Sequence, residues 1–189
     1  MSTAELDTIV GEVTRVLQAV DAGAVSALEQ RIASAPRVYV AGAGRTGLIV
    51  RAFAMRLMHL GMEVHVVGDV TTPAFRAGDL LVIGSGSGET GTLRVLAERS
   101  KELGGALAVV TIVPTSTIGR LADVAVRLDA SSPKIVPRRG EAPVRVSAQP
   151  MGSLFEQALL LLLDAVVMRL AAACSTSSDE MFARHANLE

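Results

Sequence analysis

Two glycine-rich segments of this chain place hydroxyl groups where they could bind an anion. The segment 84–90 alternates glycines with Ser85 and Ser87 and ends at Thr90, between an apolar run and a helix-forming segment. Glycines let a loop turn its N–H groups toward one point, and a helix N-terminus adds donors and partial positive charge. The segment, including the Gly86 backbone, therefore predicts a phosphate monoester site. Ordinary loop and N-cap roles are the alternative for the three hydroxyls.

The second segment, 42–47, reads Gly-Ala-Gly-Arg-Thr-Gly and contains Gly44, Arg45 and Thr46. We predict that these three residues bind the same ligand. Arg45 could hold a substrate or screen negative charge that develops during a reaction, and a surface arginine is the alternative. Thr46 could donate to a substrate hydroxyl or cap the following helix.

Glu156 is the candidate general base because it lies in the first turn of a predicted helix, where the dipole favours a carboxylate. One carboxylate can take a proton from one carbon and return it to the neighbouring carbon. Spacing alone favours another interpretation, in which Ser153 is the N-cap and Glu156 completes a capping box. His59, in the last turn of another helix, is either structural or a second acid–base group.

Alternating strands and helices must position these residues. Apolar runs predict five strands, at 37–41, 63–67, 79–83, 106–113 and 124–128. Helices are predicted between them at 46–60, 90–103 and 116–122, after a helical lead-in with apolar spacing at 9–20 and 25–32. This alternation predicts an α/β three-layer sandwich with a five-stranded parallel sheet of order 2-1-3-4-5. In that order both glycine loops follow the strands that flank the topological switch point, where ligands bind.

The segment 154–173 predicts a helix that is apolar nearly all round. Glu156, Asp164 and Arg169 interrupt it, so its uncharged run is too short to span a membrane. Burial between subunits would explain the apolar surface, and we therefore predict a homo-oligomer; a central helix inside a monomer is the alternative. Residues 130–152 predict a long loop, and 179–189 a last short helix.

Composition excludes several classes of protein. The net charge is −1 and aromatic residues make up 3% of the 189 residues, which argues against nucleic acid or an anionic membrane as partners. A single cysteine, Cys174, and an N-terminus unlike a signal peptide predict a cytoplasmic protein. The spacing of His, Cys and carboxylates predicts no metal site, and we expect no organic cofactor.

A dinucleotide-binding protein is a remote alternative. The segment 42–47 fits G-x-G-x-x-G, and Asp69 follows the second predicted strand where a ribose-binding acid would lie. The chain leaves little material for a substrate domain, however, and a dinucleotide would not explain the hydroxyls of 84–90.

The segment 84–90 resembles the sugar isomerase (SIS) domains. Further segments narrow the resemblance to the 6-phospho-3-hexuloisomerases, namely 44–47, 55–61, 150–156 and 183–189. The likeness covers nearly the whole chain, so we expect one SIS domain over 1–189. It implies a cofactor-free tetramer that converts D-arabino-hex-3-ulose 6-phosphate to D-fructose 6-phosphate through a 2,3-enediol. It also implies a place beside hexulose-6-phosphate synthase in formaldehyde fixation by the ribulose monophosphate pathway.

The resemblance also bears on individual residues. It favours Glu156 as the base over its capping role. It also favours an acid–base or carbonyl-polarising role for His59, and implies that His185 reaches a neighbouring subunit's site. Thr46 stands where the family often has serine, which keeps the hydroxyl. Another phosphosugar isomerase and a non-catalytic, sugar-phosphate-sensing SIS module are the alternative functions.

Overall fold

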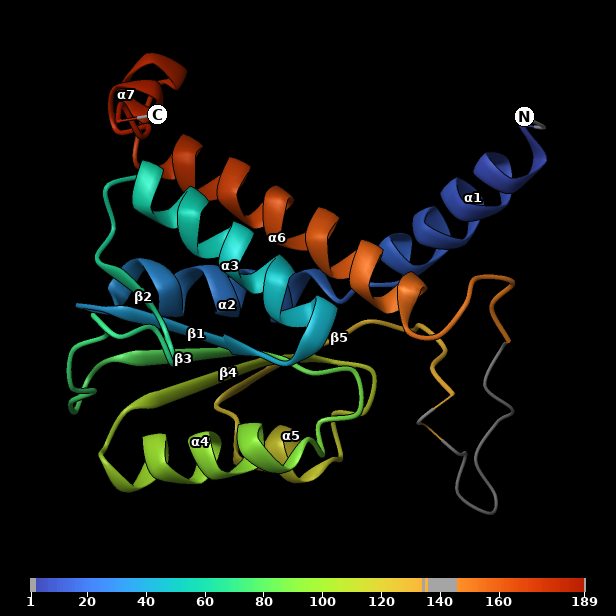
Figure 1. The fold of residues 1–189 in the computed structure, drawn as a ribbon, viewed down its shortest axis with the longest axis horizontal. Helices are drawn as coiled ribbons and strands as arrows, with labels where there is room; N and C mark the ends of the chain where they lie inside the picture. The colour runs from blue at the N-terminus through green and yellow to red at the C-terminus, as the bar shows by residue number, and fades with distance from the viewer. Residues whose placement is uncertain (1–2, 134, 136–145, 189) are drawn as a thin grey trace.

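The computed structural model describes residues 3–133, 135 and 146–188. It contains a five-stranded sheet, every strand parallel to its neighbours, in the order β2-β1-β3-β4-β5 (Figure 1). The strands are β1 (Val38–Gly42), β2 (Val64–Val66), β3 (Leu80–Gly84), β4 (Ala106–Thr111) and β5 (Val124–Arg127). The predicted strand order is therefore confirmed.

Helices cover both faces of this sheet and complete the predicted three-layer sandwich (Figure 1). One side holds α1 (Ala4–Gln18), α2 (Ala22–Ser34), α3 (Gly44–His59) and α6 (Ser153–Ala173), and the other holds α4 (Gly91–Glu102) and α5 (Thr117–Leu121). The last helix, α7 (Ser178–Ala183), lies beside the C-terminal end of α3. The helical lead-in predicted before the first strand corresponds to α1 and α2.

Alternating side chains of the central strands divide the core between the two faces. In β1, Val40 packs toward α3 and α6, whereas Tyr39 packs toward α4 and α5. In β3, Val82 and Ile83 divide in the same way. Because both faces are buried, these strands read in the sequence as continuous apolar runs.

Two glycines let α3 lie directly against β1. A Cβ atom at Gly47 would stand 2.7 Å from the carbonyl oxygen of Gly42, which is closer than atoms pack. The close approach of the helix to the strand therefore requires glycine at positions 42 and 47. It also brings the first turn of α3 to the carboxyl end of the sheet.

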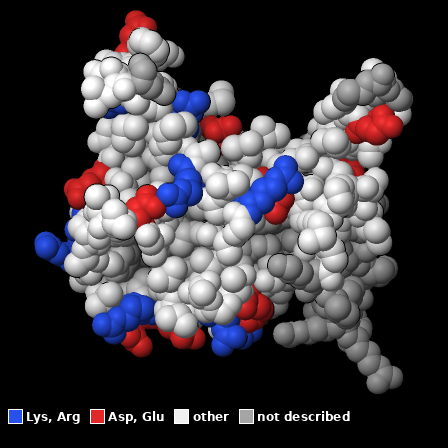
Figure 2. Space-filling view, viewed as in Figure 1, with Lys and Arg blue, Asp and Glu red and all other residues white. Residues whose placement is uncertain are grey.

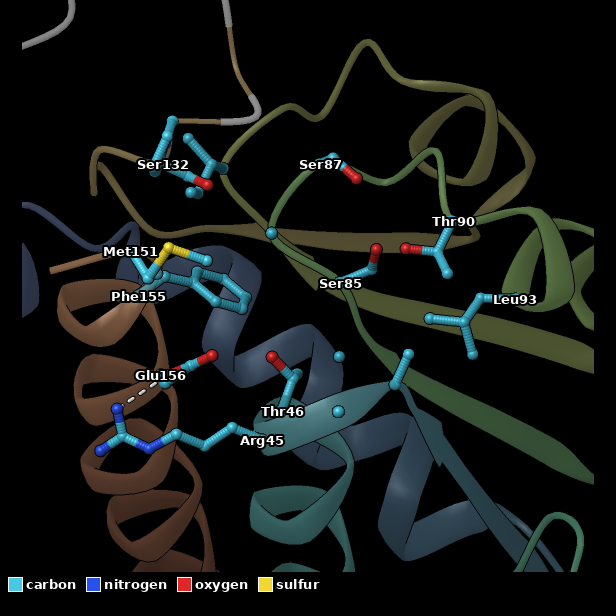
Figure 3. A pocket seen from close by; sticks show the side chains of 17 residues that line it. Arg45, Thr46, Ser85, Ser87, Thr90, Leu93, Ser132, Met151, Phe155 and Glu156 are labelled. Carbon is cyan, nitrogen blue, oxygen red and sulfur yellow. Dashed lines mark hydrogen bonds and ion pairs between the residues drawn. The ribbon is translucent and has the colours of Figure 1, made fainter.

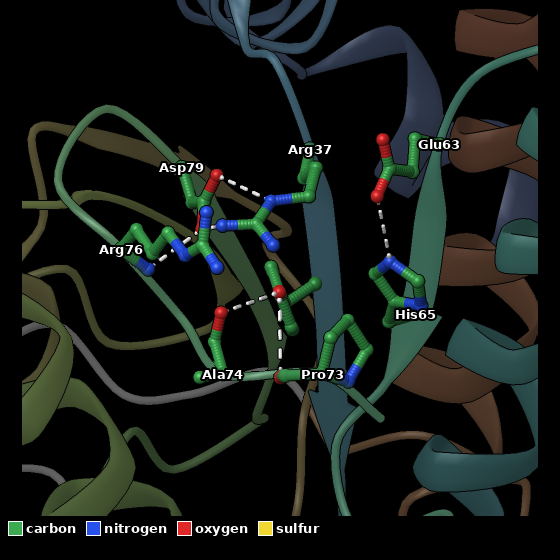
Figure 4. Close-up of polar contacts among 8 residues, drawn as sticks. Arg37, Glu63, His65, Pro73, Ala74, Arg76 and Asp79 are labelled. Atoms are coloured by element: carbon green, nitrogen blue, oxygen red, sulfur yellow. Dashed lines mark hydrogen bonds and ion pairs between the residues drawn. The ribbon is translucent and has the colours of Figure 1, made fainter. Parts of the chain in front are cut away.

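The opposite, amino end of the sheet is tied by a buried ion pair (Figure 4). Asp79 is 1% exposed and accepts hydrogen bonds from Arg37 Nε at 3.0 Å, Arg37 Nη2 at 2.7 Å and the Arg76 backbone N–H at 2.7 Å. The buried Tyr39 hydroxyl donates to the Ala74 carbonyl at 3.2 Å. These contacts fix the segment between β2 and β3 at the end away from the glycine loops.

The long helix α6 buries nine of its 21 residues, and its outer surface exposes Leu160, Leu161 and Met168. Figure 2 shows broad uncharged areas on the face it displays, broken by isolated basic and acidic groups. Among the helices that the structure describes, none combines the length and apolarity needed to cross a membrane.

Candidate active site

The carboxyl ends of β1 and β3 open into a cavity of about 370 Å³. Most of the predicted site residues line this cavity: Gly44, Arg45, Thr46, Ser85, Gly86, Ser87, Thr90 and Glu156. They come from the start of α3, the loop after β3 and the first turn of α6 (Figure 3). The topological switch point thus brings together residues that are as far as 112 positions apart in the sequence.

The hydroxyl-bearing loop is held by its own serines. Ser85 is buried and its Oγ accepts from the Gly88 N–H at 3.1 Å, while Ser87 Oγ accepts from the Glu89 N–H at 3.2 Å. Thr90 is the N-cap residue of α4, but its side chain makes no capping hydrogen bond. Each serine hydroxyl still has a proton to donate, so shaping the loop and binding an anion are compatible roles. Figure 3 shows the Ser85 and Thr90 hydroxyls pointing toward one another.

A second set of contacts fixes the same loop against α5. Glu89 Oε1 accepts from the Thr117 N–H at 2.7 Å, and this hydrogen bond lowers the pKa of the Glu89 carboxyl. Gly88 has φ +63°, and a Cβ atom there would stand 1.9 Å from Ser116 Oγ. The loop backbone is therefore held in one conformation, with the Glu89 carboxylate bound to α5.

On the opposite wall, Arg45 joins α3 to α6 (Figure 3). Its Nη1 lies 2.9 Å from Glu156 Oε2 and donates to Ser153 Oγ at 3.1 Å. The Glu156 side chain is 17% exposed and that of Arg45 is 55% exposed. A carboxylate thus faces the cavity with a guanidinium beside it that compensates its charge.

This contact corrects the capping interpretation of the α6 N-terminus. We expected Ser153 to be the N-cap, but the helix begins at Ser153, its N-cap is Gly152, and no side chain caps it. The Ser153 hydroxyl and the Glu156 carboxylate are instead bound by Arg45. The predicted capping box is therefore wrong.

The floor of the cavity is apolar and was not predicted. Phe155, Leu93 and Ile112 line it and are 3%, 4% and 7% exposed, and Met151 and Gly152 line its rim. These residues looked like ordinary core and loop positions in the sequence. Their arrangement gives a cavity that is polar on two walls and excludes water below.

The two predicted histidines lie away from the cavity. His59 ends α3, about 21 Å along the helix axis from Arg45 at a rise of 1.5 Å per residue. Its ring is 3% exposed and stacks on that of His185 with centroids 5.5 Å apart. Burial, followed by the Arg56 charge, lowers the pKa of His59. The structure thus brings the histidines together but does not bring them to the cavity.

The residue proposed to bind a ribose also lies outside this cavity. Asp69 Oδ1 forms an ion pair with Arg51 Nη2 at 2.7 Å, in a separate groove between α3 and β2. Helix–strand packing accounts for Gly42 and Gly47, and Asp69 is engaged by Arg51 away from the glycine loops, which weakens the dinucleotide interpretation. In the described part of the chain, no three His, Cys, Asp or Glu side chains gather where they could hold a metal ion.

Residues 31–161 match the family model described as the SIS domain. The chain belongs to the SIS domain family. This SIS domain is 46% identical over 162 residues to the 3-hexulose-6-phosphate isomerase of Bacillus subtilis, covering 86% of this chain and 85% of that protein. It is 42% identical over 187 residues to the enzyme of the same name from Mycobacterium gastri, covering 99% and 91%.

A solved structure supports the same relationship. The crystal structure of a Methanococcus jannaschii protein, described as inferring a molecular function of 3-hexulose-6-phosphate isomerase, matches this SIS domain with a TM-score of 0.84. The two sequences are 30% identical, and the match covers 98% of this chain and 99% of that chain. The predicted SIS fold and family are therefore confirmed.

Proposed function

We propose that this SIS domain is a 6-phospho-3-hexuloisomerase that converts D-arabino-hex-3-ulose 6-phosphate to D-fructose 6-phosphate. The observation that carries the proposal is the Glu156 carboxylate, which lines the same cavity as the Ser85–Thr90 loop. A phosphate held by that loop would present the sugar chain to the carboxylate. Relatives that bear the name of this enzyme, at 42% and 46% identity over most of the chain, support the choice of substrate.

In this mechanism Glu156 is the general base. It removes the proton from C2 of the 3-ketose, the C2–H electron pair forms the C2–C3 double bond, and the C3 oxygen gains a proton to give the 2,3-enediol. The O2 proton then leaves, the carbonyl forms at C2, and Glu156 returns its proton to C3. The substrate is thereby oxidised at C2 and reduced at C3 within one molecule, as in any intramolecular oxidoreductase.

The neighbouring groups have supporting roles in this proposal. Arg45, already within 2.9 Å of Glu156, would stabilise negative charge on the enediolate oxygens. Thr46, on the same turn of α3, would donate to a substrate hydroxyl. The backbone of Gly44 and Gly86 lets the ligand approach closely. All of these residues line the cavity.

We further infer a homo-oligomer, which we expect to be a tetramer of subunits that each form one SIS domain over residues 1–189. Leu160, Leu161 and Met168 on α6 are apolar and exposed, as expected for a surface that another subunit covers. Association could bring His185, with His59 stacked behind it, to a neighbour's cavity as an acid–base or carbonyl-polarising group. A monomer in sedimentation analysis would overturn this part of the proposal.

We infer that the enzyme acts in the cytoplasm, on the product of hexulose-6-phosphate synthase. A coupled assay tests it: the protein is mixed with ribulose 5-phosphate, formaldehyde and that synthase, and fructose 6-phosphate is measured. In heavy water, exchange at the base should introduce deuterium into the product.

Glu156→Gln is the decisive variant in this assay. It should remain folded and lose activity by at least about 100-fold, because it removes the general base; Glu98→Gln on exposed α4 is the matched control. A folded Glu156→Gln protein that keeps most of its activity would refute the mechanism. Turnover of other phosphosugars alone would favour another isomerase, and binding without turnover would favour a sensing SIS module.

A further inference from the structure

Glu12 on α1 binds the segment that leads into the cavity. Its Oε2 accepts from Ser147 Oγ at 2.6 Å and from Gln149 Nε2 at 3.0 Å, and its Oε1 accepts from the Ala148 N–H at 2.9 Å. The donors lie 135–137 residues later in the chain. One carboxylate therefore holds three consecutive residues of a segment that belongs to no helix or strand.

Two further hydrogen bonds support this anchor, by which we mean the contacts of Glu12 with residues 147–149. The Ser147 N–H donates to Ser131 Oγ at 3.0 Å, and the Gln149 N–H donates to Ser147 Oγ at 3.0 Å. An ionised acceptor strengthens such contacts. The Ser147 hydroxyl is also the main cause of the lowered pKa of Glu12, so the carboxylate is ionised at neutral pH.

The segment 147–149, which Glu12 holds, leads directly into the start of α6 at the cavity. Two residues after Gln149, Met151 adopts φ +57°, a conformation that costs a side-chain-bearing residue about 1–2 kcal/mol. Such a conformation persists only where the surroundings hold it. Met151 and Gly152 line the cavity, and α6 starts at Ser153.

No side chain caps the start of α6, as is also true of α1, α3 and α4. Asp21, Ser116 and Ser177 cap α2, α5 and α7 through their side chains. The entry of α6 is held by a backbone bond from the Ser153 N–H to the Pro150 carbonyl at 3.2 Å and by the anchor just before it.

We propose that Glu12 is a positioning residue that holds the first turn of α6, and with it Glu156 and Ser153, in register with Arg45. The inference rests on the proposed function for the role of Glu156. Glu12 does not line the cavity and touches none of the residues of the 84–90 loop that the structure describes. It should therefore affect the chemical step and leave phosphate binding unchanged.

The test compares Glu12→Gln with wild type and with Glu5→Gln, a control on the exposed first turn of the same helix. The glutamine amide would direct a donor at the three donors that now converge on the carboxylate. We expect kcat to fall about tenfold, because small displacements of a catalytic group are costly. The KM and the calorimetric affinity for fructose 6-phosphate should change less than about twofold, and hydrogen exchange should accelerate at 147–156 but not at 84–90.

Ser147→Ala removes the same contact from the other partner. It should reproduce the kcat effect, and the double variant should fall short of the product of the two single effects, because both remove one interaction. An unchanged kcat in folded Glu12→Gln protein would overturn the inference. So would equal losses of kcat, ligand affinity and thermal stability, which indicate general structural damage.

Failure of the proposed function would be visible separately. If the wild-type protein makes no fructose 6-phosphate, the isomerase proposal fails, yet the exchange comparison still decides the anchor. Unaltered exchange at 147–156 in Glu12→Gln would then overturn the positioning role on its own.

Discussion

At the scale of single residues, Arg45 joins two walls of the cavity. It contacts Glu156 and Ser153, which lie 111 and 108 positions away, so no local pattern could reveal the pair. The residue types in the two glycine loops nevertheless predicted which residues line the cavity. Hydroxyls between glycines suit a phosphate wherever such a loop follows a buried strand.

Substitution of Ser87 tests whether the 84–90 loop binds the phosphate. Ser87→Asp places a negative charge at the cavity wall, and repulsion should abolish detectable binding of fructose 6-phosphate in calorimetry. Ser87→Asn, polar but uncharged, should weaken binding far less. Equal affinity of the Asp variant and wild type would show that the phosphate lies elsewhere.

At the scale of elements, the conformation of the loop between β3 and α4 requires a glycine at position 88. Gly88 combines φ +63° with a Cβ position 1.9 Å from Ser116 Oγ, so Gly88→Ala incurs both backbone strain and overlap. We expect the free energy of unfolding to fall by about 2–4 kcal/mol in urea titrations. Binding of inorganic phosphate should weaken as well, because the loop must shift.

Gly91→Ala is the matched control three residues later. A Cβ atom there meets nothing within 4 Å, and the position begins α4. Alanine should leave stability unchanged or raise it slightly, since it favours the helix. Similar losses in both variants would mean that the loop is simply intolerant of any side chain.

Much of the fold could be predicted at this scale because hydrophobic periodicity is local. The strands of the central sheet were expected within one or two residues of their observed bounds. The fourth strand ends at Thr111 and not at 113, because the Thr111 hydroxyl accepts from the Val113 N–H and turns the chain. The N-terminus of α6 was misassigned because tertiary contacts with Arg45 replaced local capping.

Across the whole molecule, the C-terminal segment returns to the end of α3 that is remote from the cavity. Arg184 Nη1 donates to the His59 carbonyl at 2.9 Å, and the His185 ring stacks on the His59 ring. This placement could not be predicted from the sequence, because four strands and three helices lie between α3 and α7 along the chain.

The buried His59 makes stability depend on pH. Its pKa is lower in the folded protein than its ordinary value near 6.5, so the unfolded chain binds more protons between these two values. Stability from neutral His59 is therefore fully present above about pH 6.5 and is lost as the pH falls toward the folded value. The melting temperature should drop from about pH 7.5 to about pH 5.5, and less so in His59→Phe.

The carboxylates with lowered pKa values do not contribute to the change in melting temperature over this pH range. Glu12, Glu89 and Asp123 have lowered pKa values in the fold and ordinary values of 4.5, 4.5 and 3.8, so they stay ionised in both states throughout that window. His65→Phe, at a ring that contacts Tyr39 outside the His59 cluster, is the control. The same slope in wild type and His59→Phe would assign the pH effect to another group.

The Arg37–Asp79 pair secures the amino end of the sheet, while Arg45, Glu156 and the 84–90 loop line the cavity at the carboxyl end. The contacts that fix the sheet and the residues that line the cavity thus lie at opposite ends, or poles, of the same five strands. Side chains that line the cavity can change without disturbing the bonds that register the strands, as long as the close-packed Gly47, Gly84 and Gly88 are kept. A mutagenesis library confined to the cavity pole should yield altered substrate preference far more often than collapse of the protein.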